Sequence, residues 1–348
     1  MGTTTIRIRE LSEAELLKIT YAGDLFDDDI DICKKQYKAY SKKYHPDAGY
    51  DKNCFIHISE LYSQAIKQIE EGTWEKKNYI KKTCINGKQI MFKYLYAFTF
   101  ELGICYVCSK KIIYFLDADK KKYLDNAIKR INGLHYGNDE MKEVLSRCVP
   151  VIHSHGVLKD HRHYLILEKT EDVYPLKKLL DAMGEIPPEH VAWIISRLSS
   201  LCCFLEYNGL VHNGIDMNSC FISPEYHSVL LLGGWWYTVE DKKELIGTTK
   251  EIYDLMPVIA KTNKTANVTT DLECVKKIGR SLFNEKTCRS LFTRTDIPTD
   301  IIMFLAKGPE SDAIKEMKIW DTYLENAYGV RKFIKLNITK NEIYKTIT

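Results

Sequence analysis

The apolar positions in the first seventy residues recur at helical spacing in two stretches, with a proline-containing turn between them. The first stretch, over residues 30–44, presents Ile30, Cys33, Tyr37, Tyr40 and Tyr44. The second, over residues 55–69, presents Phe55, Ile58, Leu61, Tyr62, Ala65, Ile66 and Ile69. A shorter helix is predicted at 11–18, where Ser12 and Glu15 form a capping-box pattern and Leu16 and Ile19 face the core. We expect the two long helices to pack antiparallel as a helical hairpin.

The charged residues of the first long helix are concentrated on one of its faces. Lysines 34, 35, 38 and 42 fall mainly outside its apolar stripe, so one face is basic. Three aspartates, 27–29, precede the helix, where the helix dipole favours negative charge. The chain then turns at His45-Pro46-Asp47, because proline cannot continue a helix. The basic face is expected to dock on an acidic partner.

The segment Tyr44-His45-Pro46-Asp47 after a lysine-rich helix, followed by Phe55 and Leu61-Tyr62-Ser63-Gln64-Ala65, resembles the J-domain of DnaJ-type co-chaperones. The resemblance implies an all-α J-domain over residues 1–72 that binds a DnaK-type heat-shock chaperone and stimulates its ATPase. It assigns recognition to Lys34, Lys35, Lys38 and Lys42, and the trigger to His45, Pro46 and Asp47. Taken singly, the tripeptide could be only a turn and the lysines only a solvated face. Helix, turn and helix together favour the J-domain.

Further along, the pattern changes from helical to mixed. A charged stretch is expected to form a linker at 73–84. Residues 89–101 and 104–116 predict a strand hairpin, and 163–168 a buried strand. Helices are predicted at 120–132 and 174–181, and a long amphipathic one at 188–207 that ends at Asn208-Gly209. A short hairpin is expected around 224–232. The predicted fold class is therefore α+β.

The segment Leu210-Val211-His212-Asn213-Gly214-Ile215-Asp216-Met217-Asn218-Ser219-Cys220-Phe221-Ile222 resembles the catalytic loop of a protein kinase. The order of predicted elements is similar to the two-lobed kinase layout, and Asp271-Leu272-Glu273 at the start of an apolar helix is also similar to some kinases. The resemblance implies a kinase-like domain over residues 85–340.

Phosphoryl transfer needs an aspartate for the hydroxyl, an asparagine and an aspartate for magnesium, and a lysine for the phosphates. In this sequence Gly214 occupies the first position, Ser219 the second and Leu232 of Leu232-Gly233-Gly234 the third. The strand expected to carry the lysine reads Ile112-Ile113-Tyr114-Phe115. The sequence thus predicts a pseudokinase with no catalytic residue, metal or cofactor. We interpret Asp216 as a turn cap and His212 as a loop anchor.

Composition limits the remaining possibilities. Fifty basic and 47 acidic residues give a net charge of +3, and the basic residues Arg331, Lys332 and Lys335 are too few for nucleic-acid binding. No apolar run reaches membrane-spanning length, and the 11 cysteines are scattered through apolar segments as thiols are in a reducing compartment. Cys105 and Cys108 have no second pair with which to bind zinc. A cytoplasmic protein is expected, with no membrane partner.

The leading hypothesis is a co-chaperone adaptor: the J-domain recruits the chaperone, and the pseudokinase domain binds a client that the sequence does not identify. One alternative is an atypical active kinase, or a nucleotide-binding transferase working around Asp216, that a J-domain regulates. Another is an antagonist that diverts a chaperone. Trp235-Trp236-Tyr237 could be a partner anchor or could be buried between lobes.

Overall fold

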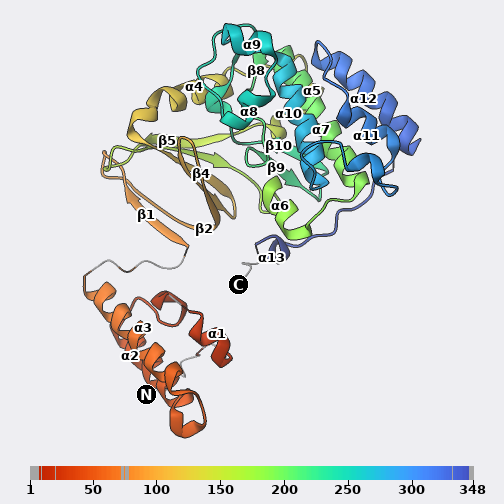
Figure 1. Cartoon of the computed structure of the whole chain (residues 1–348). Helices are drawn as coiled ribbons and strands as arrows, with labels where there is room; N and C mark the ends of the chain where they lie inside the picture. Colours follow the sequence, from red (N-terminus) through yellow and green to blue (C-terminus); the bar gives the residue numbers. More distant parts are fainter. Residues whose placement is uncertain are drawn as a thin grey trace. The chain divides into compact units, whose positions relative to one another are not determined.

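A computed structural model describes residues 8, 10–19, 21–71, 74, 78–330 and 332–344. Parts of the expected 1–72 domain and 73–84 linker, and the residue Arg331, therefore lie outside the described residues. The chain divides into two compact units (Figure 1). Unit 1 consists of residues 1–83 and 87–94, and unit 2 of residues 84–86 and 95–348.

Unit 1 contains the predicted helices, which are α1 (Glu13–Leu17), α2 (Ile30–Lys43) and α3 (Lys52–Glu70). The expected capping box starts α1: the Ser12 hydroxyl accepts from the backbone N–H of Glu15, and the Glu15 carboxylate accepts from that of Ser12. Asp29 caps α2, accepting from the backbone N–H groups of Asp31 and Ile32. Local side-chain caps therefore fix where these helices begin.

The core of unit 1 lies between α2 and α3. Its most buried side chains are Leu16, Cys33, Tyr44, Cys54, Ile58 and Ala65. The predicted stripe on α2 differs in one respect: Tyr37 is only half-buried, whereas Gln36 is buried. Gln36 is satisfied there because its side chain donates to the Asp27 carboxylate (2.8 Å) and accepts from the backbone N–H of Asp27 (2.8 Å). A hydrogen-bonded polar group can thus replace an apolar one in the stripe.

The expected linker is partly a strand. β1 (Tyr79–Thr83) pairs antiparallel with β2 (Gln89–Phe100), with Tyr79 opposite Lys93 and Thr83 opposite Gln89. The linker prediction failed over this range because the charged side chains of Lys81 and Lys82 obscure the strand pattern. Cross-strand pairing with β2 overrides that weak local preference.

The large sheet has the strand order β1-β2-β3-β4-β6-β5, and all of it except β1 and the first part of β2 belongs to unit 2. The predicted strand at 104–116 is in fact two strands, β3 (Gly103–Cys108) and β4 (Lys111–Leu116), because the chain turns at Ser109-Lys110. The predicted strand at 163–168 is confirmed as β6 (His163–Glu168), whereas β5 (Ile152–Val157) was not predicted. Two helices follow the sheet strands β3 and β4 in sequence, α4 (Lys121–Asn132) and α5 (Asp139–Leu145).

The rest of unit 2 is mainly helical. The long predicted helix is confirmed as α7 (Pro188–Tyr207), buried on most of its surface. The helices after it are α8 (Lys250–Leu255), α9 (Val258–Asn263), α10 (Val268–Leu282), α11 (Thr299–Ala306), α12 (Ala313–Tyr328) and α13 (Lys340–Ile343). Both α10 and α12 pack on α7 (Figure 1). This mixed α+β arrangement is compatible with the expected kinase-like layout.

Short strands join the helices. β7 (Tyr174–Pro175), β9 (Cys220–Ser223) and β10 (Ser228–Leu231) form one small sheet, and β8 (Leu210–Val211) pairs with β11 (Val239–Glu240). The helix predicted at 174–181 starts later, as α6 (Leu176–Met183), because Tyr174 and Pro175 pair with β9. These strands hold the loop between β8 and β9 at both ends.

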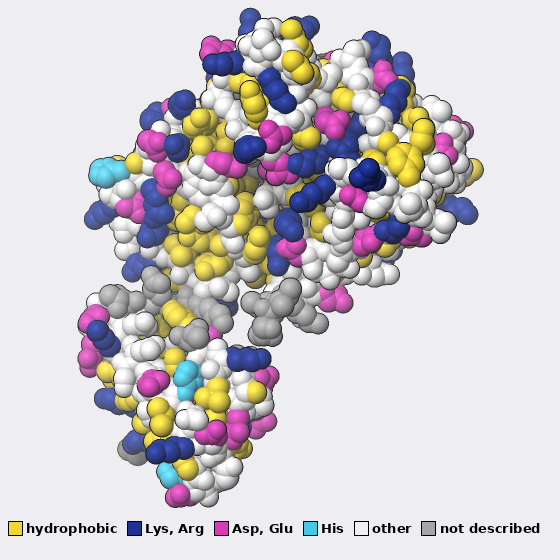
Figure 2. Space-filling model, viewed as in Figure 1, with side chains coloured by type: hydrophobic (Ala, Val, Ile, Leu, Met, Phe, Trp, Pro, Cys, Tyr) yellow, Lys and Arg dark blue, Asp and Glu magenta, His cyan; other side chains and the backbone are white. Residues whose placement is uncertain are grey.

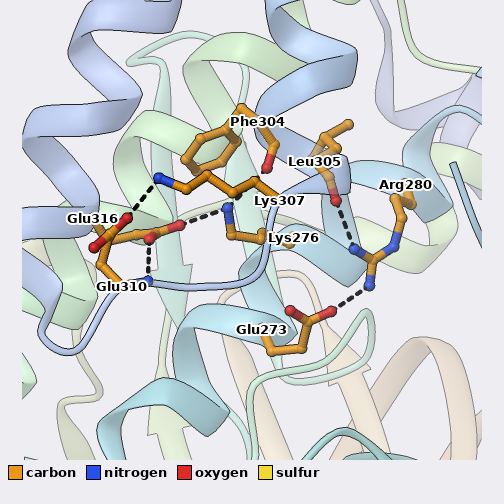
Figure 3. A network of polar contacts seen from close by, with 8 residues as sticks. All are labelled: Glu273, Lys276, Arg280, Phe304, Leu305, Lys307, Glu310 and Glu316. Atoms are coloured by element: carbon orange, nitrogen blue, oxygen red, sulfur yellow. Dashed lines mark hydrogen bonds and ion pairs between the residues drawn. The ribbon is translucent and has the colours of Figure 1, made fainter. Parts of the chain in front are cut away.

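A buried polar network joins α10 to α12 and to the end of α11 (Figure 3). The Lys276 ammonium lies 2.7 Å from the Glu316 carboxylate and donates to the Phe304 carbonyl at 2.8 Å. Arg280 donates to the Leu305 carbonyl (2.9 Å) and to Glu273 (2.7 Å). Because both Lys276 and Glu316 are almost fully buried, neither could lose its partner without a large cost.

Two surface properties bear on function. On the face shown in Figure 2, hydrophobic side chains gather over the strands of unit 2, while basic and acidic side chains are interspersed over its helices. None of the helices in the described part of the chain has the length and apolarity that crossing a membrane requires.

Candidate functional site

The His45-Pro46-Asp47 tripeptide lies in a tight turn between α2 and α3. His45 caps the turn, its Nδ1 accepting from the backbone N–H of Asp47 at 3.2 Å, and Gly49 closes it with a φ of 88°. The His45 ring packs edge-on against Phe55 of α3, with ring centroids 5.4 Å apart. The Asp47 carboxylate lies 3.4 Å from the same ring and is 91% exposed. The turn is therefore fixed to α3 while its carboxylate faces solvent.

The four lysines predicted for recognition are exposed on α2. Lys34, Lys38 and Lys42 are four residues apart, so they follow one line along the helix, and Lys35 lies beside it. Among the described residues, no acidic side chain forms an ion pair with any of these four lysines. The neighbouring Lys43 differs, because it lies 3.6 Å from Glu10. The basic face is thus open to an external acidic group.

In unit 2, hydrogen bonds to Asp271 of α10 hold the loop between β8 and β9 in place. Its carboxylate accepts from the backbone N–H groups of His212 (2.6 Å) and Asn213 (2.9 Å). Burial raises the pKa of Asp271 to about 7, although these two hydrogen bonds oppose the shift. The ring of His212 is fully buried edge-on against Trp235, and burial lowers its pKa to about 3. His212 therefore anchors the loop through its backbone N–H, which donates to Asp271, while its ring packs against Trp235.

Gly214, at the expected position of a catalytic aspartate, lies against the Gly233-Gly234 segment. A Cβ on Gly214 would lie 2.7 Å from the carbonyl oxygen of Gly234 and 2.9 Å from its Cα. Conversely, a Cβ on Gly234, whose φ is +79°, would lie 2.4 Å from the carbonyl oxygen of Gly214. The two backbones touch at the position where the kinase resemblance expects the catalytic aspartate, so Gly214 leaves no room for such a side chain without a shift of the Gly234 backbone.

Asp216 serves as the predicted turn cap. Its Oδ1 accepts from the backbone N–H groups of Asn218 (2.8 Å) and Ser219 (2.6 Å). The Ser219 hydroxyl in turn accepts from the backbone N–H of Asp216 at 2.8 Å. The pKa of Asp216 is raised by burial. Hydrogen bonds within the loop therefore engage Oδ1 of the carboxylate that an alternative mechanism would need as a base.

Aromatic side chains fill the cleft above this loop. Trp236 stacks on Phe100 of β2, with centroids 5.0 Å apart, and contacts Tyr114 of β4 edge-on at 4.8 Å. Trp235, Trp236 and Tyr237 are all buried, which confirms burial as the correct alternative for this segment. The cavity that remains has a volume of about 30 Å³. Small-molecule sites typically enclose roughly 300–1,000 Å³, so this space does not admit a nucleotide as it stands.

Helix α4 fixes the segment that carries these aromatic residues. The Asn126 side-chain amide donates to the carbonyl groups of Trp236 (3.1 Å) and Thr238 (2.9 Å). Arg130 makes a bidentate pair with Glu240 of β11, at 2.5 and 2.8 Å. This pairing lowers the pKa of Glu240 to about 2. The aromatic filling of the cleft is therefore built into the fold of unit 2.

Sequence reasoning gave Asp271, Asn126 and Phe100 no role. The sequence placed Asp271 in a segment similar to some kinases, at the start of an apolar helix, but did not indicate its contacts with the loop. Nδ1 of His153 lies 3.4 Å from the Glu168 carboxylate. Among the described residues, no three metal-ligating side chains lie together.

Comparison with known proteins finds similar structures but no related sequence. No protein-family model and no curated protein matches the sequence. The chain matches many solved structures, among them that of vaccinia related kinase 3. That similarity has 15% sequence identity and a TM-score of 0.49, and it covers 71% of this chain and 90% of the other. Identity at this level carries no information about activity.

Proposed function

We propose that this protein is a J-domain co-chaperone that recruits a DnaK-type chaperone and stimulates its ATP hydrolysis through His45-Pro46-Asp47. The observation that carries the proposal is the exposed turn at the end of a basic helix. The Asp47 carboxylate is 91% exposed, and the turn is fixed by contact of His45 with Phe55. A fixed but accessible carboxylate is suited to a polar contact in a partner, because little further ordering is needed on binding.

The basic face of α2 supports the same proposal. Its lysines have no acidic partner among the described residues, so binding to an acidic surface would not first require internal ion pairs to break. Complementary charge also raises the rate of encounter with a partner. We propose Lys34, Lys35, Lys38 and Lys42 as the recognition residues and His45, Pro46 and Asp47 as the trigger.

Unit 2 is proposed to be a catalytically inactive, kinase-like module that binds a client. Backbone contact between Gly214 and Gly234 and the aromatic filling of the cleft argue against phosphoryl transfer. The rival proposal, a transferase that works through Asp216, is disfavoured because Oδ1 of its carboxylate serves as a turn cap and the cavity beside it is only about 30 Å³. Joining the two units in one chain would raise the effective concentration of chaperone near a client.

A charge-reversal experiment tests the recognition step. The full chain with Lys34→Glu, Lys38→Glu and Lys42→Glu should bind an ATP-loaded DnaK-type chaperone at least about tenfold more weakly than the wild type, since each reversal removes an attraction and adds a repulsion. The control carries Lys18→Glu, Lys67→Glu and Lys81→Glu, three exposed lysines elsewhere in unit 1. Its affinity should stay within about twofold. Equal weakening in both variants, measured by surface plasmon resonance, would contradict site-specific recognition by α2.

A further inference from the structure

A second pocket in unit 2 shares no lining residue with the filled cleft. Its volume is about 530 Å³, which lies within the range of roughly 300–1,000 Å³ typical of small-molecule sites. Three segments form it: the chain before and at the start of β5, the chain at and after the end of β6, and the β9–β10 hairpin. The pocket therefore touches both the large sheet and the helical part of unit 2.

Polar and apolar residues both line the pocket, but apolar atoms form most of its exposed surface. Val149, Val173 and Leu232 are buried at its base, and Leu230 is half-buried beside them. Val151, at the rim, is 53% exposed. An apolar ligand body could cover this surface and remove it from water, which is the main favourable term in binding to such a wall.

The charged groups of the pocket differ in whether they already have partners. Asp172 accepts a hydrogen bond from the Ser223 hydroxyl, and Glu168 lies 3.4 Å from the ring of His153. The Lys169 ammonium donates to the carbonyl groups of Ser109 (2.7 Å) and Thr170 (3.0 Å), and burial lowers its pKa to about 8. Both carboxylates and the lysine are thus engaged within the protein.

Arg147 is the exception. Its Nε donates to the Val144 carbonyl at 3.3 Å, and among the described residues no carboxylate pairs with its guanidinium. The side chain lines the pocket from the turn that precedes β5. A guanidinium without a carboxylate partner is well suited to a planar anion, with which it forms charge-assisted hydrogen bonds.

We propose that this pocket binds a small organic anion, with its apolar body against Val149, Val173 and Leu232 and its acidic group paired with Arg147. Because the lining residues come from both the sheet and the helical part, an occupant would also raise the stability of unit 2. The proposal does not depend on the proposed co-chaperone activity, since none of these residues belongs to unit 1.

Two fluorescent probes that differ in charge test the proposal on the full chain. Anilinonaphthalene sulfonate has an aromatic body and an anionic group, and phenylnaphthylamine has the same body without the charge. Wild-type protein should bind the anionic probe saturably, at one site. Arg147→Gln should weaken the anionic probe at least about tenfold and leave the neutral probe within about twofold, because only the anion loses a charge-assisted bond.

Val151→Trp, which fills the pocket from its exposed rim, should abolish binding of both probes, and Ser146→Trp fills it from another wall if the first variant does not fold. Val258→Trp is the matched control, because Val258 is 79% exposed on α9 and should leave both affinities unchanged. A cooperative melting transition for each variant would show that it is folded, so that probe binding to a partly unfolded core is excluded. The proposal is overturned if no saturable binding occurs, if neither filling variant blocks it, or if Arg147→Gln weakens both probes equally.

Discussion

The backbones of Gly214 and Gly234 lie so close together that a larger residue at either position would clash with the other. Gly214→Asp would restore the carboxylate of a kinase loop, but its Cβ would meet the Gly234 carbonyl oxygen at 2.7 Å. We expect this variant to lower the free energy of unfolding by about 1–3 kcal/mol, as overpacking does, and to gain no phosphotransferase activity. Asn218→Asp adds the same charge at an exposed position of the loop and should change stability by less than about 0.5 kcal/mol. Urea unfolding followed by tryptophan fluorescence measures both. Unchanged stability in Gly214→Asp would contradict the close packing.

The buried carboxylate of Asp271 predicts a pH dependence. Burial raises its pKa from 3.8 to about 7, so between these values the folded protein holds a proton that the unfolded chain releases. The contribution of Asp271 to stability must therefore fall as pH rises from about 4 to about 7, by at most about 1.4 kcal/mol per pH unit. Asp271→Asn cannot titrate, so the stability difference, wild type minus variant, should decrease across this range. Urea unfolding of both proteins at about pH 5, 6 and 7 measures it. A difference that is constant or increases would show that Asp271 does not titrate as proposed.

At the residue scale, contacts between residues close in the sequence could be predicted, whereas contacts between residues far apart in the sequence could not. The turn cap by Asp216 follows from a carboxylate two and three residues before the amides it binds. The bonds from Asp271 to His212 and Asn213 join residues 59 and 58 positions apart, which no local pattern reveals. The glycine at position 214 is plain from the sequence, but its close backbone contact with Gly234 is not.

Between elements, the Lys276–Glu316 pair joins α10 to α12 (Figure 3). Glu316→Gln leaves a buried ammonium without its counter-charge, and we expect a loss of about 3–5 kcal/mol in the free energy of unfolding. The double variant Lys276→Met with Glu316→Leu should recover at least half of that loss, since it buries no charge. Lys250→Ala breaks a solvent-exposed pair with Asp254 and should leave the stability almost unchanged. A double variant less stable than Glu316→Gln would contradict this account of the pair.

Helices were easier to predict than strands. The helical stripes, and the caps at Ser12 and Asn208, are local signals, and α1, α2, α3 and α7 were predicted close to their observed bounds. The strand β1 was missed because the charged side chains of Lys81 and Lys82 obscure its pattern, β5 was also missed, and β3 and β4 were merged because the turn between them is only two residues long. Pairing and burial outweigh local preference in such strands.

For the whole molecule, two compact units in one chain combine an exposed turn at His45-Pro46-Asp47 with a unit of sheet and helices whose cleft is filled. Two units could be expected because the His-Pro-Asp turn and the segment at 210–222 resemble different families, although unit 1 extends to residue 83 and includes residues 87–94 instead of ending at residue 72. The filling of the cleft could not, since Phe100, Tyr114 and Trp236 meet only in the folded unit. Under the proposed function, the identity of the partner of unit 2 would decide whether the protein assists or diverts the chaperone.

The central claim is that the His45-Pro46-Asp47 turn triggers ATP hydrolysis, and single-turnover hydrolysis by a DnaK-type chaperone tests it most directly. The full-length wild type should accelerate hydrolysis, whereas His45→Gln and Asp47→Asn should lose at least about nine-tenths of that acceleration, which corresponds to about 1.4 kcal/mol of barrier. Glu60→Gln, at an exposed position on α3, should behave as the wild type. The account is contradicted if the wild type does not accelerate hydrolysis by any of several such chaperones, or if both turn variants accelerate it as well as the wild type does.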